Sequence, residues 1–346
     1  MDVVVVGGGL AGAEFVRHAS KLPVNITLIE PKDYMVCQAL LPELLSGKVE
    51  EEEVLVDLKE FCSRVGVEFV KDRAERVEEG FVITRGGKEV EYDVLVVAVG
   101  AETNHLEGAE EVNTLEGVVR AKRALNDAER VIVVGSGITG VETALELSEM
   151  GYEVSVVEGT GRILPSFSLK VSNFVYKILM KEGVDVRTSA MVVRVDEDGV
   201  VTGRGKVFGD VVIWCAGLRP SSFLECLDVP KERGWVRVDP FLRANSLFAV
   251  GDCAHVEVRG KVATKTVLEA EMQARHVARN LERMLKGCRL AEYRVRSSLE
   301  EPIAMITLAR NRAILVYKGV AITRPMKAIY WIKKMAVRRF LRSFCP

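Results

Sequence analysis

The stretch MDVVVVGGGLAGAEF, residues 1–15, decides the class of fold, and the stretch ERVIVVGSGITGVETALEL, residues 129–147, repeats its pattern. Each consists of a run of β-branched residues, a Gly-x-Gly-x-x-Gly turn and a run of helix formers. A buried strand that leads through such a turn into a helix sets the free N–H groups of the helix N-terminus against a phosphate. The repeat therefore predicts two phosphate-binding units in an α/β protein.

Each copy also carries an acidic residue at the same spacing. The predicted second strands, NITLIE (25–30) and YEVSVVE (152–158), end at Glu30 and Glu158, each 18 residues after the third glycine of its turn. A carboxylate there accepts hydrogen bonds from a ribose diol, and at Glu158 it would repel a 2′-phosphate, which favours NADH over NADPH. Two dinucleotide sites in one chain indicate FAD in one and a nicotinamide nucleotide in the other. The cradle residues predicted to bind them are Gly7, Gly9, Leu10, Ala11 and Gly12 in the first copy and Gly135, Gly137, Ile138 and Gly140 in the second.

The composition is typical of a folded, soluble protein, with 48% hydrophobic and 28% charged residues among 346. This length exceeds what one core normally supports, so we expect two or three domains. No apolar run approaches the roughly 18 residues of a spanning helix, and the first strand begins at Asp2, which predicts a cytoplasmic location without a signal peptide. No metal site or disulfide framework is expected, because the seven cysteines include no C-x-x-C pair and the histidines show no ligand spacing. The histidines are His18, His105, His255 and His276.

A later stretch of the sequence indicates which cradle binds FAD and which binds NADH. NSLFAVGDCAHV, residues 245–256, places a strand directly before Gly251 and Asp252. It resembles the second flavin motif of the two-dinucleotide-binding flavoproteins, whose aspartate at this place binds the ribityl chain of FAD. The resemblance implies FAD in the first cradle, with the backbone near Ala74 facing its adenine, and NADH in the second cradle.

That family inserts its NADH-binding domain into the FAD-binding domain. YDVLVVAVGAE (92–102) and GDVVIWCAGLRP (209–220) resemble its two crossing strands, and Gly100 and Gly217 stand at their ends. The expected fold is therefore α/β, with two Rossmann-like domains and a small C-terminal region that ends in an amphipathic helix. The expected parts are residues 1–103 and 226–290 for FAD, 104–225 for NADH, and 291–346 for the C-terminal strands and helix.

Within the family the chain is most similar to type II NADH dehydrogenases. The similarity is carried by EPKDYMVCQALLPELLSG (30–47), GITGVETALEL (137–147), GRILPSFSLKVSNFVYKILMKEGVDV (161–186) and EPIAMITLARNRAILVYKGVAITRPMKAIYWIKKM (301–335). It implies that NADH passes a hydride to FAD, and that two electrons then reach a quinone or a similar acceptor. It also implies that Glu142 lies beside the nicotinamide and the flavin. Members of this family line a quinone channel with two Ala-Gln elements, and of these only Gln273 is present in this sequence. Lys265 lies near the start of a helix predicted to begin near Thr264, and it would add positive charge at the pyrimidine end of the flavin.

Three alternatives stay open. TKTVLEAEMQA (264–274) resembles sulfide:quinone oxidoreductases, although no cysteine lies between Cys62 and Cys215 for their chemistry. Cys37, alone in the segment that follows Glu30, keeps a single-cysteine coenzyme A disulfide or persulfide reductase as a candidate. A redox-sensing binding protein, controlled by its bound nucleotide, is the alternative from a different class.

The stretch RPMKAIYWIKKMAVRRFLRSF, residues 324–344, predicts a basic amphipathic helix, and residues 302–346 contain ten Lys or Arg and no Asp or Glu. At 100° per residue one face is apolar and the opposite face basic. The apolar face holds Ile329, Ile332, Ala336 and Phe340, and the basic face Lys327, Lys334, Arg338 and Arg342. Such a helix is typical of proteins on an anionic membrane surface, here the inner face of the cell membrane, or it contacts a second subunit of a homodimer. No nucleic-acid-binding motif accompanies it.

Overall fold

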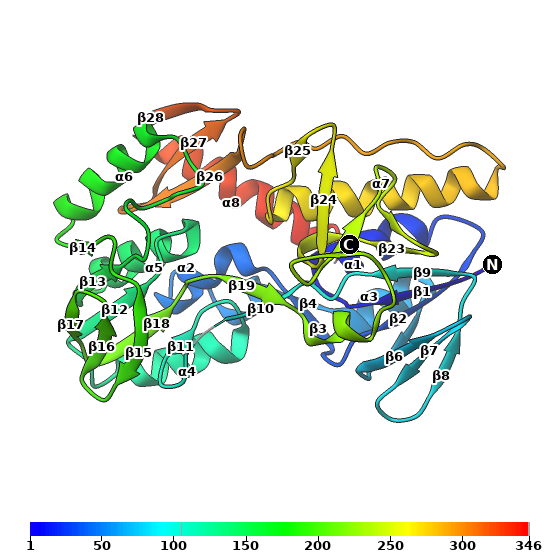
Figure 1. Cartoon of the computed structure of the whole chain (residues 1–346), viewed down its shortest axis with the longest axis horizontal. Coiled ribbons are helices and arrows are strands. Elements are labelled where there is room, and N and C mark those ends of the chain that lie inside the picture. The colour runs from blue at the N-terminus through cyan, green and yellow to red at the C-terminus, as the bar shows by residue number, and fades with distance from the viewer. Residues whose placement is uncertain (105, 345–346) are drawn as a thin grey trace.

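A computed structural model describes residues 1–104 and 106–344, so that His105 and Cys345 lie outside the described residues. Its largest sheet has the strand order β22-β23-β9-β1-β2-β5 (Figure 1). The strands are β1 (Asp2–Val6), β2 (Asn25–Ile29), β5 (Glu68–Val70), β9 (Val94–Val97), β22 (Arg243–Ala244) and β23 (Leu247–Ala249). All neighbours are parallel except the short edge strand β22. Parallel strands of this kind read as continuous apolar runs because both faces of the sheet are covered.

Three helices accompany this sheet: α1 (Leu10–Ala19), α3 (Leu58–Val65) and α7 (Val267–Leu285). The helices α1 and α7 pack against each other although about 250 residues separate them. The first cradle and the late flavin-like motif are therefore brought into one domain.

A second parallel sheet has the order β11-β18-β12-β13-β14. Its strands are β11 (Glu110–Glu111), β12 (Arg130–Val134), β13 (Glu153–Val157), β14 (Asp185–Arg187) and β18 (Val211–Trp214), and its helices are α4 (Leu115–Leu125), α5 (Ile138–Glu149) and α6 (Leu169–Lys181). The second cradle lies here, between β12 and α5.

The chain crosses between the two sheets through an antiparallel pair, β10 (Ala101–Thr103) and β19 (Leu218–Pro220), in which Ala101 lies opposite Pro220. The strands of the first sheet come from both sides of this insertion in the sequence. This confirms the predicted α/β fold with one dinucleotide-binding unit inserted in the other.

Smaller sheets and short helices surround these two units. They are β3 (Tyr34–Val36) with β4 (Leu55–Asp57); β6 (Ala74–Glu78), β7 (Phe81–Thr84) and β8 (Glu89–Glu91); β15 (Val192–Asp196), β16 (Gly199–Thr202) and β17 (Gly205–Phe208); and β20 (Lys231–Glu232), β21 (Trp235–Val238), β24 (Ala254–Val258) and β25 (Lys261–Val262). The short helices are α2 (Leu41–Leu45), η1 (Gln38–Leu40), η2 (Glu51–Glu53), η3 (Ser222–Cys226) and η4 (Gly251–Cys253).

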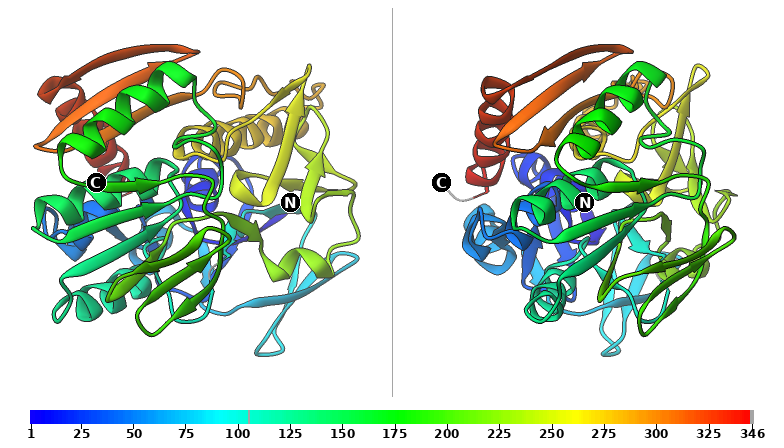
Figure 2. Two further views of the ribbon diagram at one scale, coloured as in Figure 1. Left: turned by 60° about the vertical axis from the view of Figure 1, so that its left-hand side comes forward. Right: turned by 90° about the vertical axis from the view of Figure 1, so that its left-hand side faces the viewer.

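A C-terminal unit completes the fold, made of the antiparallel strands β26 (Ile303–Leu308), β27 (Arg312–Tyr317) and β28 (Val320–Met326) and the helix α8 (Lys327–Arg342). Figure 2 shows this sheet and α8 together at one side of the molecule. The helix lies on β27, while β26 contacts α5 of the inserted unit. No helix among the described residues is long and apolar enough to cross a membrane.

The faces predicted for α8 are wrong in part. Lys333 and Lys334 are buried, whereas Trp331, Ile332 and Met335 are each at least half exposed. Simple apolar periodicity misassigned the two faces because carboxylates from other elements reach the helix and pair with these two lysines. Such paired charges can be buried where unpaired ones cannot.

Candidate functional site

The two cradles have closely matching geometry. The first glycine of each adopts a positive φ, 104° at Gly7 and 94° at Gly135, which side chains disfavour. A Cβ on Gly12 would lie 1.9 Å from the carbonyl oxygen of Gly7, and one on Gly140 would lie 2.0 Å from that of Gly135. The first and third glycines of each turn are therefore required by the protein itself.

The middle glycines are different, because they face open space. Gly9 and Gly137 are the N-cap residues of α1 and α5, and both have φ −65° and ψ −174°. No side chain caps either helix, and no atom lies within 4 Å of a Cβ built on Gly9 or Gly137. Free backbone N–H groups at a helix N-terminus with room for a ligand fit a pyrophosphate. Both cradles thus fit the dinucleotides, FAD and NADH, that the sequence predicts.

The two predicted ribose acids hold matching positions. Glu30 Oε2 accepts a hydrogen bond from Gly8 N at 2.7 Å, and its other oxygen accepts one from Lys32 N. Glu158 Oε2 accepts from Ser136 N at 2.9 Å and from Ser136 Oγ at 2.6 Å, while its Oε1 accepts from Thr160 N. Each carboxylate is therefore fixed at the turn of its own cradle.

The late flavin-like motif lies beside the first cradle. Strand β23, which ends just before Gly251, is parallel to β9, and β9 is parallel to β1. The carboxyl ends of adjacent parallel strands gather at one edge, so Asp252 and the first glycine turn share that edge. Burial raises the pKa of Asp252, and the charge of Lys265 opposes this shift.

Lys265 is held against the backbone of this motif. Its Nζ donates to the carbonyl oxygens of Asp252 and Ala254, the latter at 3.2 Å, and lies 3.7 Å from the centroid of the Trp235 ring. Burial lowers the pKa of Lys265, and the charge of Asp252 raises it. The positive charge expected near the flavin therefore lies next to Asp252, and Trp235 is a neighbour that the sequence did not indicate.

Gln273 is buried, and its Oε1 accepts a hydrogen bond of 2.8 Å from Gly251 N. The structure therefore places this side chain as a brace of the flavin-like turn. Its place beside a quinone channel remains a prediction.

Three further predicted positions lie at edges of the sheets. Ala74 begins β6, a few residues after Val70, whose carbonyl oxygen accepts from Glu30 N at 3.1 Å. Gly100 and Gly217 both have positive φ, 64° and 81°, and stand directly before the crossing strands β10 and β19. They lie where the backbone turns from one unit into the other.

Glu142 lies in α5, five residues into the helix that follows the second cradle, and it is almost completely buried. Its Oε1 accepts hydrogen bonds from Lys333 Nζ at 2.7 Å and from Thr307 N at 2.6 Å. Lys333 Nζ also donates to Thr307 Oγ1 at 2.7 Å. Sequence reasoning missed Lys333, although the adjacent lysines inside the apolar stretch WIKKM were a signal that partners exist elsewhere in the chain.

Cys37 is 2% exposed, and burial raises the pKa of its thiol to about 11. The charges of Lys333 and Glu43 also act on it, so Cys37 lies near both residues. Cys253 is likewise buried, and burial raises the pKa of its thiol to about 11. Neither thiol is set up to be a thiolate at neutral pH.

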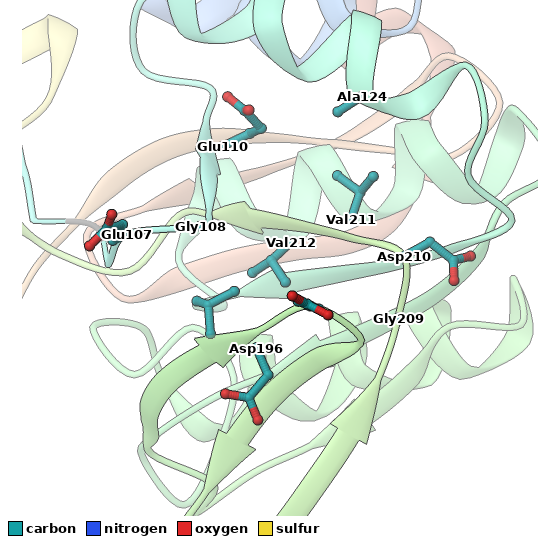
Figure 3. A pocket seen from close by; sticks show the side chains of 11 residues that line it. Glu107, Gly108, Glu110, Ala124, Asp196, Gly209, Asp210, Val211 and Val212 are labelled. Carbon is teal, nitrogen blue, oxygen red and sulfur yellow. The ribbon is translucent and has the colours of Figure 1, made fainter.

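A cavity of about 450 Å³ is lined by none of these residues; Figure 3 shows the side chains around it. Gly209, Asp210 and Val211 line it at the start of β18, together with Glu110 of β11. It therefore lies toward the amino ends of the second sheet, whereas ligands of such sheets bind at the carboxyl ends. We assign it no part in nucleotide binding.

Comparison with known proteins agrees with this arrangement. A family model described as pyridine nucleotide-disulphide oxidoreductase matches residues 1–275. An external alternative NAD(P)H-ubiquinone oxidoreductase B3 of Arabidopsis thaliana mitochondria is 28% identical over 323 residues, covering 74% of this chain and 55% of that protein. A type II NADH:quinone oxidoreductase of Staphylococcus saprophyticus is 25% identical over 338 residues, covering 82% of this chain and 83% of that protein. The chain thus spans about half the length of the plant protein and most of the bacterial one.

A similar fold is found in the solved structure of the sulfide:quinone oxidoreductase from Aquifex aeolicus. It has a TM-score of 0.86 and 19% sequence identity, and the match covers 99% of this chain and 91% of that one. At this level of identity the likeness concerns the fold.

Proposed function

This chain belongs to the pyridine nucleotide-disulphide oxidoreductase family, and we propose that it is an FAD-dependent NADH dehydrogenase that passes electrons to a quinone. The observation that supports this most is the pair of matched cradles with Asp252 beside the first of them. That arrangement suits one resident flavin nucleotide and one exchanging nicotinamide nucleotide. The names of the bacterial and plant relatives support a quinone as the acceptor.

The side chains bind and orient, since the flavin, when bound, supplies the chemistry by accepting a hydride and releasing electrons to an acceptor. The N-terminus of α1 would hold the FAD pyrophosphate, with Glu30 at its ribose and Asp252 at its ribityl chain. The N-terminus of α5 would hold the NADH pyrophosphate, with Glu158 at its ribose. Lys265 would stabilise negative charge at the flavin, because its ammonium is fixed beside Asp252.

The Glu142–Lys333 pair lies where the FAD-binding unit, the inserted unit and α8 meet. Glu142 belongs to the NADH-binding helix, Lys333 to the C-terminal unit, and Cys37 of the FAD-binding unit lies near Lys333. We include Glu142 in the proposal as a residue beside the reacting nicotinamide and flavin. Its ion pair with Lys333 is buried at this junction.

Rapid mixing of the FAD-loaded protein with NADH, followed by a soluble quinone analogue, tests this function. We expect the flavin absorbance to bleach with NADH and to return with the quinone. A flavin that NADH leaves oxidised would disprove the dehydrogenase, and a reduced flavin that quinones leave reduced would disprove the acceptor.

A thiol-dependent reductase is less well supported. The raised pKa of Cys37 and its burial argue against a reactive thiolate at this position. In a Cys37→Ser variant we expect NADH oxidation by quinone to continue at the wild-type rate.

We also infer that the C-terminal unit binds an anionic membrane surface, through a set of residues that overlaps only in part with the faces predicted by periodicity. Its exposed side chains are both apolar and basic. The apolar ones are Tyr317, Val320, Ile322, Trp331, Ile332 and Met335. The basic ones, none of which has an ion-pair partner within residues 1–104 and 106–344, are Arg312, Lys318, Arg324, Lys327, Arg339 and Arg342.

This combination fits a lipid interface, because apolar side chains enter the headgroup region while each nearby basic residue adds about 1 kcal/mol on anionic lipid. Tyr317 lies opposite Val320 and therefore points to the same face of the sheet. A membrane-bound protein would have direct access to a lipid-soluble quinone.

Co-sedimentation with vesicles that contain anionic lipid tests the surface. Replacing Trp331, Ile332 and Met335 by Ser should release the protein from the vesicles without changing its thermal midpoint, because all three side chains are exposed. The matched control replaces the exposed Leu169, Tyr176 and Met180 of α6. Equal binding of both triple variants and the wild type would contradict the assignment.

A further inference from the structure

We propose that Lys48 and Glu146 form a proton-transfer path from the protein surface to the buried Glu142–Lys333 pair. The proposal rests on the proposed function, because reduction of a quinone consumes protons. In the balanced reaction, NADH, one H⁺ and a quinone give NAD⁺ and a quinol. The hydride from NADH provides both electrons and one of the two protons that the quinone takes up. The second proton must come from the solvent.

The first support is the line of acids along one face of α5. Glu142, Glu146 and Glu149 stand at positions i, i+4 and i+7, which lie on the same side of a helix, about 6 Å apart per four residues. Their side chains are 7%, 4% and 22% exposed. The line therefore runs from the buried pair to the surface of the protein.

Lys48 joins the two outer acids. Its Nζ lies 2.8 Å from a carboxylate oxygen of Glu146 and 2.5 Å from one of Glu149, and its side chain is 26% exposed. One ammonium group thus contacts both a buried and a solvent-reaching carboxylate. A proton taken up at Glu149 or Lys48 has a direct hydrogen-bonded route to Glu146.

The inner part of the path is a polar junction of α2, α5 and α8. Tyr330 of α8 has its pKa raised by burial and by the charges of Glu43 and Glu146, so it lies near both carboxylates. Glu43 accepts a hydrogen bond from Lys334, while its Oε1, in a side chain that is 4% exposed, has no hydrogen-bond partner among the described residues. A buried carboxylate oxygen left free in this way is costly unless water or a proton reaches it.

The ion pairs of this junction contain one more carboxylate than ammonium groups. Four carboxylates, of Glu43, Glu142, Glu146 and Glu149, face the three ammonium groups of Lys48, Lys333 and Lys334. Burial raises the pKa of Glu146, although Lys48 opposes this shift. Glu146, buried and in contact with Lys48, stands one helical turn from Glu142 and can pass a proton inward toward it.

Glu146 acts through Glu142, and its role is that of a positioning and relay residue. The test therefore separates the two halves of the catalytic cycle in the full-length, FAD-loaded protein. Hydride transfer from NADH to the flavin takes no proton from the solvent, whereas reoxidation by a soluble quinone does. The variants are Glu146→Gln and Lys48→Met, with Glu182→Gln as the matched control, because Glu182 pairs with Arg310 at another attachment of the C-terminal unit.

In both path variants we expect NADH to bleach the flavin absorbance at the wild-type rate. We expect quinone to reoxidise the flavin at least about tenfold more slowly than in the wild type at pH 8. Small weak acids such as imidazolium should restore part of the lost rate, and the solvent isotope effect on reoxidation should rise. The thermal midpoint and FAD content are measured for each variant to establish that it is folded.

Unchanged reoxidation in folded Glu146→Gln and Lys48→Met proteins would overturn the path. Equal slowing of both half-reactions, without rescue by weak acids, would also overturn it, because that is the result of a structural role. A wild-type protein whose reduced flavin is not reoxidised by quinones would instead overturn the proposed function, and the path with it.

Discussion

Glu142 in α5 accepts a hydrogen bond of 2.7 Å from Lys333 in α8, across 191 residues of sequence. Both side chains are more than nine-tenths buried. The contact fastens the C-terminal unit to the helix that follows the second cradle, and Arg310 adds an outer attachment through Glu149 and Glu182. The position of the C-terminal unit is therefore coupled to the nucleotide-binding helix.

Removing only the lysine of this buried pair should lower the free energy of unfolding. In Lys333→Met the Glu142 carboxylate keeps the hydrogen bond from Thr307 N but loses its counter-charge in a buried place. Breaking one partner of a buried pair typically costs about 3–5 kcal/mol, whereas replacing both partners by apolar residues is often close to neutral. Denaturant unfolding should give Lys333→Met a much lower free energy of unfolding than the wild type. The double variant, Lys333→Met with Glu142→Leu, should recover at least half of that loss. A double variant as unstable as the single one would contradict this account.

The middle glycines of the cradles should separate folding from ligand binding. Gly9→Ala and Gly137→Ala place a Cβ in open space at a φ of −65° that alanine adopts readily. We expect the free energy of unfolding of each to stay within about 0.5 kcal/mol of the wild type. The added methyl group would instead meet a pyrophosphate, so that Gly9→Ala should lose FAD and Gly137→Ala should bind NADH at least about tenfold more weakly.

The control for these variants is Gly140→Ala, whose Cβ would lie 2.0 Å from the carbonyl oxygen of Gly135. It should be destabilised before any nucleotide is added. Isothermal titration with NADH and thermal melting of the three proteins make the comparison. Normal NADH affinity of Gly137→Ala would show that the pyrophosphate does not lie at this helix N-terminus.

Glu158 should set the choice between NADH and NADPH. Its carboxylate is fixed by Ser136 and Thr160, and its negative charge opposes a 2′-phosphate. Glu158→Gln removes that charge, and we expect the preference for NADH, measured as the ratio of the two dissociation constants, to fall about tenfold, or about 1.4 kcal/mol. Glu153→Gln, on the same strand but exposed, serves as the control. An unchanged ratio in Glu158→Gln would place the ribose elsewhere.

Much of the architecture was predictable because its determinants are local. The glycine spacing in residues 7–12 and 135–140, the acids at Glu30 and Glu158 and the strand before Asp252 each depend on a few neighbouring residues. These patterns identified the two cradles, and the resemblance of residues 245–256 to a flavin motif implied the insertion of one unit in the other. The physical reason is that a tight turn and a helix N-terminus limit which residues fit.

The contacts between distant elements were not predictable in the same way. Lys334 was placed on the basic face of the last helix, yet it is buried and paired with Glu43. The hydrogen bond that Gln273 accepts from Gly251 N was not predicted either. In both cases the partner lies on another element, and the periodicity of a single helix carries no information about which residues that element will bring.

Glu14 of α1 should make the FAD-binding unit sensitive to acid. Its side chain is completely buried, and although burial alone would raise its pKa, hydrogen bonds from His18, Arg17 and Arg275 hold that pKa at about 2, below the ordinary 4.5. A carboxyl group whose pKa is lowered by folding stabilises the protein fully above its unfolded pKa. That stabilisation, about 3 kcal/mol here, is lost as the pH falls from about 4.5 to about 2.

A Glu14→Gln variant tests this contribution, since its side chain does not titrate. We expect it to be less stable than the wild type at pH 7, because Arg17 and Arg275 lose their shared carboxylate. The difference in free energy of unfolding between the two proteins should shrink steadily below pH 4.5. Urea unfolding at a series of pH values measures it. A difference that is the same at pH 3 and pH 7 would show that the charge of Glu14 does not stabilise the packing of α1 on α7.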